Sequence, residues 1–140
     1  MAEAIFRDLL QKRGLSEQFR VDSAGLGGWH VGEEPHDGTR RVLRREGIAH
    51  EGLRARQFRS EDFDSFDYIV VMDEQNLQDI TRLEKYASQK VFRLMDFAPD
   101  RGSQDVPDPF FDGRFDEVYE MIRAGCEGLL SAILQAQAKR

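Results

Sequence analysis

The residue with the clearest chemical potential is Asp108, which lies between two prolines in the stretch "VPDPFFDG", residues 106–113. Because proline fixes the backbone dihedral φ, the two rings stiffen the chain on both sides of this carboxylate. A carboxylate held in this way is well positioned for proton transfer to or from a reacting group. The same stretch is also typical of a plain loop turn, since Asp and Pro are common turn residues and Phe110 and Phe111 would then be core anchors.

Two further polar residues lie at the ends of segments that the sequence predicts to be strands. Ser23 ends the alternating stretch "FRVDS", and Asp73 follows the apolar run "YIVVM". Because sites in α/β proteins gather beyond the carboxyl ends of parallel strands, we expect Ser23, Asp73 and the loop with Asp108 to face one rim. Position alone leaves a second interpretation open, in which Asp73 caps the following helix, Asn76 is a surface residue and Ser23 is an ordinary strand-end hydroxyl.

The Gly-rich stretch "LGGWHVGEEPHDG" contains the single tryptophan, Trp29. An aromatic ring there forms either a lid over the edge of the domain or one wall of a pocket for a flat ligand.

The single cysteine, Cys126, falls on an apolar stripe, which favours a buried and inert thiol over a nucleophile. One cysteine also excludes an internal disulfide framework and a Cys-rich metal site. The histidines show no metal-ligand spacing and are assigned to the surface: His30, His36 and His50.

The pattern of apolar residues alternates along the chain between the periods of strands and helices. Three segments are typical of strands: residues 19–25, 68–72 and 90–95. Four segments show helical spacing: residues 1–14, 39–47, 73–86 and 115–140. The run "YIVVM" is apolar throughout, which indicates a strand covered on both faces. The sequence therefore predicts a single α/β domain over residues 1–140, built on an open, mostly parallel sheet with helices on both faces.

Composition excludes several classes of protein. The net charge is −6 and no Lys/Arg-rich stretch stands out, which argues against nucleic acid or an anionic membrane surface as the main partner. The apolar runs are only a few residues long, so none is expected to span a bilayer. The first residues lack the basic and apolar regions of a signal peptide, and we expect a cytoplasmic protein without a metal or cofactor.

Together these stretches resemble one family, the low-molecular-weight protein tyrosine phosphatases. The resemblance covers the whole chain through "MAEAIFRDLL", "VDSAGLGGWHVGEEP", "ARQ", "EDFDSFDYIVVMDEQN" and "VPDPFFDG". It implies that Asp108 is the general acid that protonates the leaving tyrosine oxygen and then the base that activates water. It implies that the aromatic walls of the slot for the phenyl ring are Trp29, Phe110 and Phe111. The residues that match supports of the phosphate-binding loop are Ser23, Asp73 and Asn76.

The resemblance also implies a phosphate-binding loop that the printed chain does not hold. In this family the helix that begins "MAEAIF" directly follows the loop Cys-x5-Arg-Ser, and the loop follows the first, central strand. Neither that cysteine nor that arginine is present, and no capping residue precedes Ala2. The chemistry needs a thiolate of low pKa to accept the phosphoryl group, and backbone N–H groups with an Arg to hold its oxygens. We therefore expect an N-terminally truncated domain that lacks its first central strand, is poorly stable alone and is inactive.

The implied substrates are phosphotyrosine-containing proteins, with phosphate or sulfate as a ligand of the intact protein. Phe110 and Phe111 stand where many members carry a Tyr pair, which keeps the apolar walls and removes two hydroxyls that could be phosphorylated. Leu53 stands where the family often has a His that is hydrogen-bonded into the network of the loop, so that either this network is rewired or His50 takes over the role. Two other classes stay open: a non-catalytic pseudophosphatase that docks phosphotyrosine or a partner, and an arsenate reductase, which needs extra redox cysteines.

Overall fold

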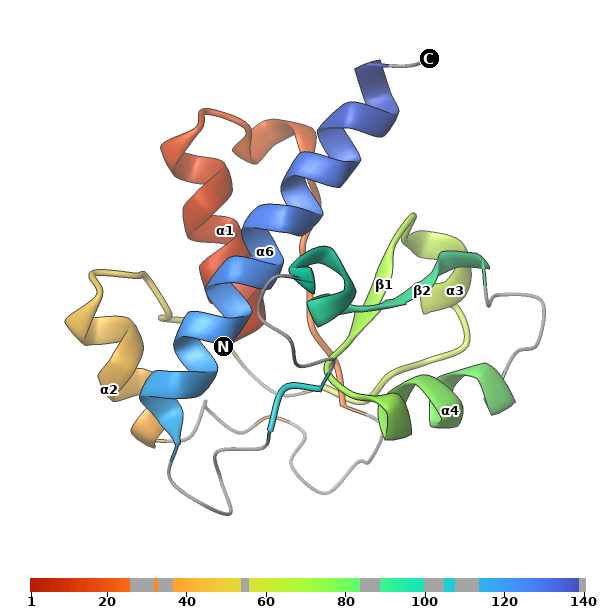
Figure 1. The fold of residues 1–140 in the computed structure, drawn as a ribbon, viewed down its shortest axis with the longest axis horizontal. Coiled ribbons are helices and arrows are strands. Elements are labelled where there is room, and N and C mark those ends of the chain that lie inside the picture. Colours follow the sequence, from red (N-terminus) through yellow and green to blue (C-terminus); the bar gives the residue numbers. More distant parts are fainter. Residues whose placement is uncertain are drawn as a thin grey trace.

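The computed structural model of the chain describes residues 1–25, 32, 37–53, 56–83, 89–99, 105–107 and 114–138. In chain order its elements are α1 (Ala2–Lys12), η1 (Ser16–Gln18), α2 (Asp37–Arg45), α3 (Asp62–Ser65), β1 (Ile69–Val71), α4 (Glu74–Leu83), β2 (Val91–Arg93), η3 (Leu94–Phe97) and α6 (Phe115–Ala138). Figure 1 shows α1, α2 and α6 grouped on one side of β1 and β2, with α3 and α4 on the other.

The described sheet has two parallel strands. β1 pairs with β2 so that Ile69 lies opposite Val91 and Val71 opposite Arg93. The strands predicted at 68–72 and 90–95 are thus confirmed as a parallel pair, although each is shorter than predicted. The second strand ends early because the chain turns at once into η3, a 3-10 helix whose Leu94 and Met95 are fully buried.

β1 is covered on both faces, as its unbroken apolar run predicts. Successive side chains of a strand point to opposite faces. Ile69 and Val71 belong to a smaller core with Phe63 of α3 and Ile80 of α4, whereas Val70 packs against the larger core formed mainly by the helices α1, α2 and α6. The predicted arrangement of helices on both faces of the sheet is therefore confirmed.

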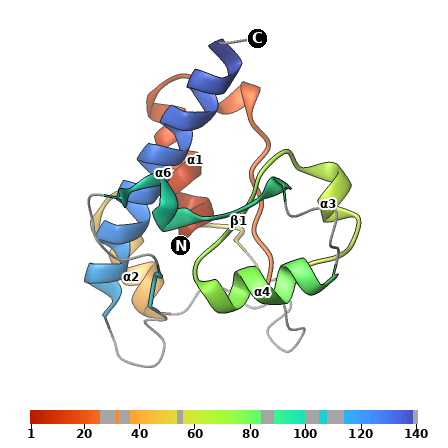
Figure 2. The ribbon, with the colours of Figure 1, turned by 45° about the vertical axis from the view of Figure 1, so that its right-hand side comes forward.

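The long helix α6 runs through the larger core and contributes many of its buried residues. It packs against α1, α2 and η3, and the two views agree that it lies beside α1 (Figures 1 and 2). Its stripe of buried residues runs from Phe115 to Ile133. Gly128 permits the close approach of η3, because a Cβ built on it would lie 1.9 Å from the backbone oxygen of Phe97.

The strand predicted at residues 19–25 is not found as a regular strand. The backbone there is extended, but the described residues give it one isolated parallel bridge, between Gly25 and Gln57. A strand requires a repeated ladder of hydrogen bonds to a neighbour, and here one carbonyl, that of Val21, instead accepts a bond from Arg7 Nη2 at 2.7 Å.

Two further features of the helices bear on the predictions. The first turn of α1 has no side-chain cap, in agreement with the sequence. Gly14 and Gly47, the last residues of the first two segments predicted to be helical, have φ values of 69° and 71°, a left-handed conformation that glycine adopts readily. No helix in the described ranges combines the length and the apolar character that crossing a membrane requires.

Candidate active site

Four of the predicted site residues lie outside the described residues: Trp29, Asp108, Phe110 and Phe111. Their predicted roles stay predictions. The structure describes the other three, Ser23, Asp73 and Asn76. It also describes the segment 105–107, which ends immediately before the predicted general acid. The described part of the candidate site therefore consists of Ser23, Asp73, Asn76 and the elements that surround them.

The carboxyl end of β1 carries Asp73, which caps α4. The Oδ1 atom of Asp73 accepts a hydrogen bond from the backbone N–H of Asn76 at 2.7 Å, and its carbonyl accepts one from Leu77 at 3.1 Å. This satisfies one of the N–H groups that the start of a helix leaves unpaired. The capping interpretation of Asp73 is confirmed, and Asn76 takes part through its backbone.

The segment 105–107 is held at the same edge. The backbone N–H of Val106 donates to the carbonyl of Met72 at 2.9 Å, and Oδ1 of Asp105 accepts a bond from the N–H of Glu74 at 3.0 Å. Val106 is buried. The chain that leads to Asp108 is thus fixed at the carboxyl end of β1 and the start of α4, which is the rim that the fold rule predicts.

Arg93, the last residue of β2, adds charge to this edge. Its Nη1 lies 3.2 Å from Oε2 of Glu74 and 3.7 Å from Oδ1 of Asp105, and its Nη2 donates to Asp96 at 3.3 Å. The guanidinium thus connects the end of β2, the start of α4 and the segment before Asp108. Sequence reasoning missed this residue, because its partners come from three separate stretches of the chain.

Ser23 is bonded to the first turn of α1. Its Oγ donates to Oε1 of Glu3 at 2.6 Å, and Oε2 of Glu3 pairs with Nη2 of Arg7 at 2.7 Å. Glu3 is 9% exposed, so its carboxylate is nearly buried, and each of its two oxygens has a partner. The sequence offered one signal for Glu3, an acidic residue in the first turn of a helix, where the helix dipole favours negative charge.

The extended segment that carries Ser23 runs in the same general direction as β1, toward the edge where α4 begins (Figures 1 and 2). Its last described residue is Gly25, whose N–H donates to the carbonyl of Arg56 at 2.8 Å and whose carbonyl accepts from the N–H of Phe58 at 2.7 Å. The motif "ARQ" therefore supplies the partner of this segment.

Cys126 is not available as a nucleophile. It is 2% exposed in the middle of α6, and its Sγ lies 4.0 Å from the carbonyl oxygen of Ala2. Burial raises the pKa of Cys126 to about 12, so the reactive thiolate is not formed near neutral pH. The prediction of a buried, inert thiol is confirmed.

The described residues contain no cluster of three or more His, Cys, Asp or Glu side chains that could hold a metal ion. Of the three histidines, His30 and His36 lie outside the described residues. His50 is half-buried rather than fully on the surface as predicted, because its ring packs back on its own loop, with Nδ1 3.2 Å from the carbonyl oxygen of Ile48.

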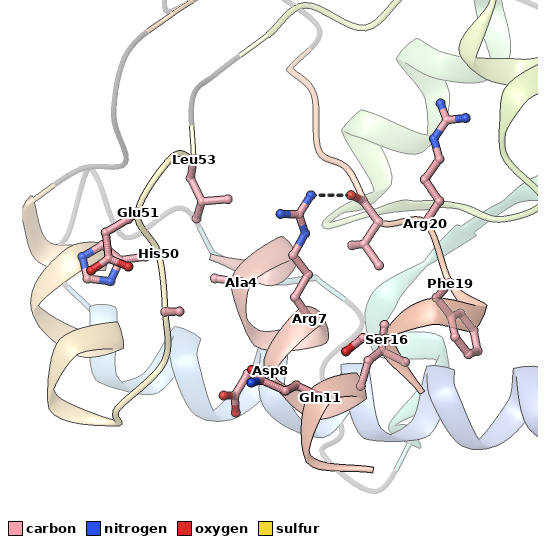
Figure 3. A pocket seen from close by; sticks show the side chains of 13 residues that line it. Ala4, Arg7, Asp8, Gln11, Ser16, Phe19, Arg20, His50, Glu51 and Leu53 are labelled. Carbon is pink, nitrogen blue, oxygen red and sulfur yellow. Dashed lines mark hydrogen bonds between the residues drawn. The ribbon is translucent and has the colours of Figure 1, made fainter. Parts of the chain in front are cut away.

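A pocket of about 490 Å³ lies on the flank of α1 and is also lined by residues from the segments 16–21 and 49–53. Figure 3 shows Arg7 reaching from α1 across it to Val21, with His50 and Glu51 on the opposite wall. The three predicted site residues that the structure describes, Ser23, Asp73 and Asn76, do not line this pocket.

The whole chain, residues 1–140, matches the family described as low molecular weight phosphotyrosine protein phosphatase. The chain belongs to this family. The resemblance found in the sequence motifs is confirmed, and so is the α/β fold that it implies.

Individual relatives agree with this membership. The chain is 48% identical over 134 residues to the low molecular weight protein-tyrosine-phosphatase YfkJ of Bacillus subtilis, covering 95% of this chain and 86% of the relative. It is 37% identical over 135 residues to PtpA of Staphylococcus epidermidis, covering 96% of this chain and 85% of that protein.

Solved structures of the family superpose closely. The crystal structure of YfkJ matches with a TM-score of 0.93 at 46% identity, over 96% of this chain and 86% of that chain. A protein tyrosine phosphatase from Entamoeba histolytica, crystallised with Hepes in its active site, matches with a TM-score of 0.90 at 29% identity, over 97% of this chain and 88% of that one.

Proposed function

We propose that this protein is a protein-tyrosine phosphatase of the low molecular weight class, acting on phosphotyrosine-containing proteins. The observation that carries the proposal is the family match over all 140 residues, with relatives named as phosphatases at up to 48% identity. The fixing of segment 105–107 at the carboxyl end of β1 supports it, because a general acid must be presented from a rigid edge.

In the proposed mechanism a cysteine thiolate attacks the phosphorus and the bond to the tyrosine oxygen breaks. Asp108 gives its proton to that oxygen as it leaves. The Asp108 carboxylate then takes a proton from water, which attacks the phosphocysteine and releases phosphate and the thiolate. Trp29, Phe110 and Phe111 would enclose the phenyl ring, and phosphate or sulfate would bind where the phosphoryl group sits.

The printed 140 residues are proposed to be inactive by themselves. Their single cysteine, Cys126, is buried in α6 and its pKa is raised to about 12. The nucleophilic cysteine, its phosphate-binding arginine and the first central strand are proposed to lie outside the printed residues. Within the described residues the extended segment up to Gly25 has one bridge, to Gln57, and this supports the last point, since a neighbouring strand would complete its ladder.

A comparison of two proteins tests this proposal. One is the printed chain, and the other is the product of the same reading frame with the codons upstream of Met1. We expect hydrolysis of p-nitrophenyl phosphate by the longer product alone, and an upstream segment that encodes Cys-x5-Arg-Ser. Turnover by the purified printed chain, or an in-frame stop with no upstream start, would overturn it.

The role of Asp108 has its own test in the active form. Asp108→Asn and Asp108→Ala should lower kcat by roughly 10²- to 10⁴-fold, the usual contribution of a general acid. The loss should be larger for phenyl phosphate than for p-nitrophenyl phosphate, whose leaving group needs less protonation. Asp64→Asn, at an exposed carboxylate of α3, is the matched control and should keep near-normal turnover.

A second candidate is a non-catalytic module that binds phosphotyrosine, which the lack of an available thiol in the printed chain favours. Saturable binding of a phosphotyrosine peptide without turnover, by every form of the protein, would support this candidate over the first. An arsenate reductase is disfavoured, because the printed chain has one cysteine and that chemistry needs several.

A further inference from the structure

Arg56 is the central residue of the motif "ARQ", and its side chain joins two carboxylates from different parts of the chain. Its Nε pairs with Oδ2 of Asp22 at 2.9 Å. Its Nη1 and Nη2 donate to the two oxygens of Asp62, the first residue of α3, at 2.9 and 3.2 Å. All three nitrogen atoms of the guanidinium are thus directed at carboxylates, and the contact with Asp62 is bidentate.

Both carboxylates are in turn bonded to backbone. Oδ1 of Asp22 accepts the N–H of Ser23 at 2.8 Å, and Oδ2 of Asp62 accepts the N–H of Arg59 at 2.8 Å. The side chain of Asp62 is 11% exposed and that of Arg56 is 23% exposed. The Arg56–Asp62 pair is therefore partly withdrawn from water, where hydrogen bonds between charged groups are stronger than on the open surface, whereas the side chain of Asp22 is 40% exposed.

The backbone of Arg56 acts on the same segment as its side chain. Its carbonyl accepts the N–H of Gly25 at 2.8 Å, and the carbonyl of Gly25 accepts the N–H of Phe58 at 2.7 Å. One residue thus holds the stretch from Asp22 to Gly25 at both of its ends. The Oγ of Ser23, between these two points, is aimed at Glu3 of α1.

We propose that Arg56 is a positioning residue, which fixes Ser23 relative to the first turn of α1 through its joint hold on Asp22, Gly25 and Asp62. The proposal rests on the proposed function for its catalytic consequence, because Ser23 is there a support of the phosphate-binding loop. It extends that function by assigning a role to the "ARQ" motif, which no catalytic step uses. Lysine cannot replace this arginine fully, because one ammonium group cannot span two carboxylates in the same planar geometry.

Amide hydrogen exchange tests the positioning directly and without any catalytic assay. It is measured in whichever form, the printed chain or the longer product, unfolds cooperatively. In Arg56→Gln, the amides of Gly25 and Phe58 should exchange faster by roughly tenfold or more, while amides buried in α6 keep their protection. Arg56→Lys should give a smaller acceleration at the same two amides.

Arg45→Gln is the matched control. Arg45 also pairs with two carboxylates, those of Glu46 and Asp116, but its side chain is 50% exposed. It should leave the exchange of Gly25 and Phe58 unchanged. Unchanged exchange at these amides in Arg56→Gln, or an equal acceleration at all amides, would overturn the proposal.

An activity measurement separates this proposal from the proposed function. In a catalytically active form, Arg56→Gln should lower kcat for an aryl phosphate with little change in KM, and Arg56→Lys should restore part of the loss. Equal kcat in Arg56→Gln and the unmodified enzyme would contradict the catalytic consequence of the positioning. If no form of the protein hydrolyses an aryl phosphate, the proposed function fails while the exchange result still decides whether Arg56 positions Ser23.

Discussion

The carboxylates that the structure describes near the end of β1 act on backbone N–H groups. Asp73 accepts from Asn76, and Asp105 accepts from Glu74, so two acidic side chains serve the unpaired N–H groups at the start of α4. The sequence alone could not decide between capping and chemistry for Asp73, because a capping residue and an acid at a strand end are the same residue type in the same position. The distance to the Asn76 N–H decides that it caps.

A pair of substitutions separates the cap from its neighbour. Asp73→Ala should lower the free energy of unfolding by about 1 kcal/mol, the usual cost of losing a side-chain cap. Asn76→Ala should cost much less, because Asn76 contributes its backbone N–H, which alanine keeps. Urea unfolding curves of the two variants measure the difference. An equal loss in both would contradict the assignment and indicate a structural role for the Asn76 side chain.

Cys126 gives a second prediction at the scale of the residue. Because burial raises its pKa to about 12, the native thiol should not react with Ellman's reagent at pH 8. One equivalent should react after unfolding in guanidinium chloride, which serves as the positive control. Rapid reaction of the folded printed chain would show that the helix opens or that the thiol is accessible.

At the scale of the element, close contact between α6 and η3 depends on glycine. A Cβ on Gly128 would lie 1.9 Å from the backbone oxygen of Phe97, and one on Gly125 would lie 2.5 Å from Cγ of the buried Leu94. The first clash is with backbone and the second is with a side chain. Relief of the first therefore requires the two elements to move apart.

Gly128→Ala should consequently destabilise the protein, although alanine favours a helix over glycine by about 1 kcal/mol. We expect a net loss of about 2 kcal/mol, since overpacking a core commonly costs about 1–3 kcal/mol. Gly125→Ala should cost less than Gly128→Ala. Ser131→Ala, at an exposed position of the same helix, should be nearly neutral, and thermal unfolding compares the three. A Gly128→Ala variant as stable as the parent would contradict the close packing.

The elements that could be predicted are those whose signal is local. The apolar run of β1 and the helical stripe of α6 depend on residues near one another in sequence, and both were predicted correctly. The stretch 19–25 has the right alternation, but a strand is defined by its partner, which no local pattern supplies. The same limit explains why no role was predicted for Arg56 or Arg93. Some of their partners are near in sequence, but Asp22, Glu74 and Asp105 come from distant stretches of the chain.

At the scale of the whole molecule, two cores lie on opposite faces of one small sheet. β1 contributes alternate residues to each core, so the family fold is assembled around it. Hydrogen bonds to backbone groups hold Asp73 and Val106 at the rim. Ion pairs join Glu3 to Arg7 on α1, and Arg93 to Glu74 on α4. The apolar pattern of the sequence therefore predicts the two cores, whereas the polar contacts that fix the rim residues are seen only in the folded chain.

The α-amino group of Met1 gives a prediction for the stability of the printed chain as a whole. Burial lowers the pKa of this group below its ordinary value of 8.0, an effect that outweighs the attraction of the Glu3 carboxylate. Burying the charged form is unfavourable, so the folded chain binds the proton more weakly than the unfolded chain does. The free energy of unfolding should therefore rise with pH, from the lowered pKa of the folded state up to about pH 9, one unit above the unfolded value.

Unfolding of the printed chain at a series of pH values between 6 and 9 checks this dependence. The same chain with an acetylated N-terminus is the control, because acetylation removes the charge and should abolish the rise. A longer product has a peptide bond in place of the amino group of Met1, and it should behave like the acetylated chain over this range. An unacetylated chain whose stability is flat or falls between pH 6 and 9, with the same slope as the control, would show that the amino group is hydrated in the folded state.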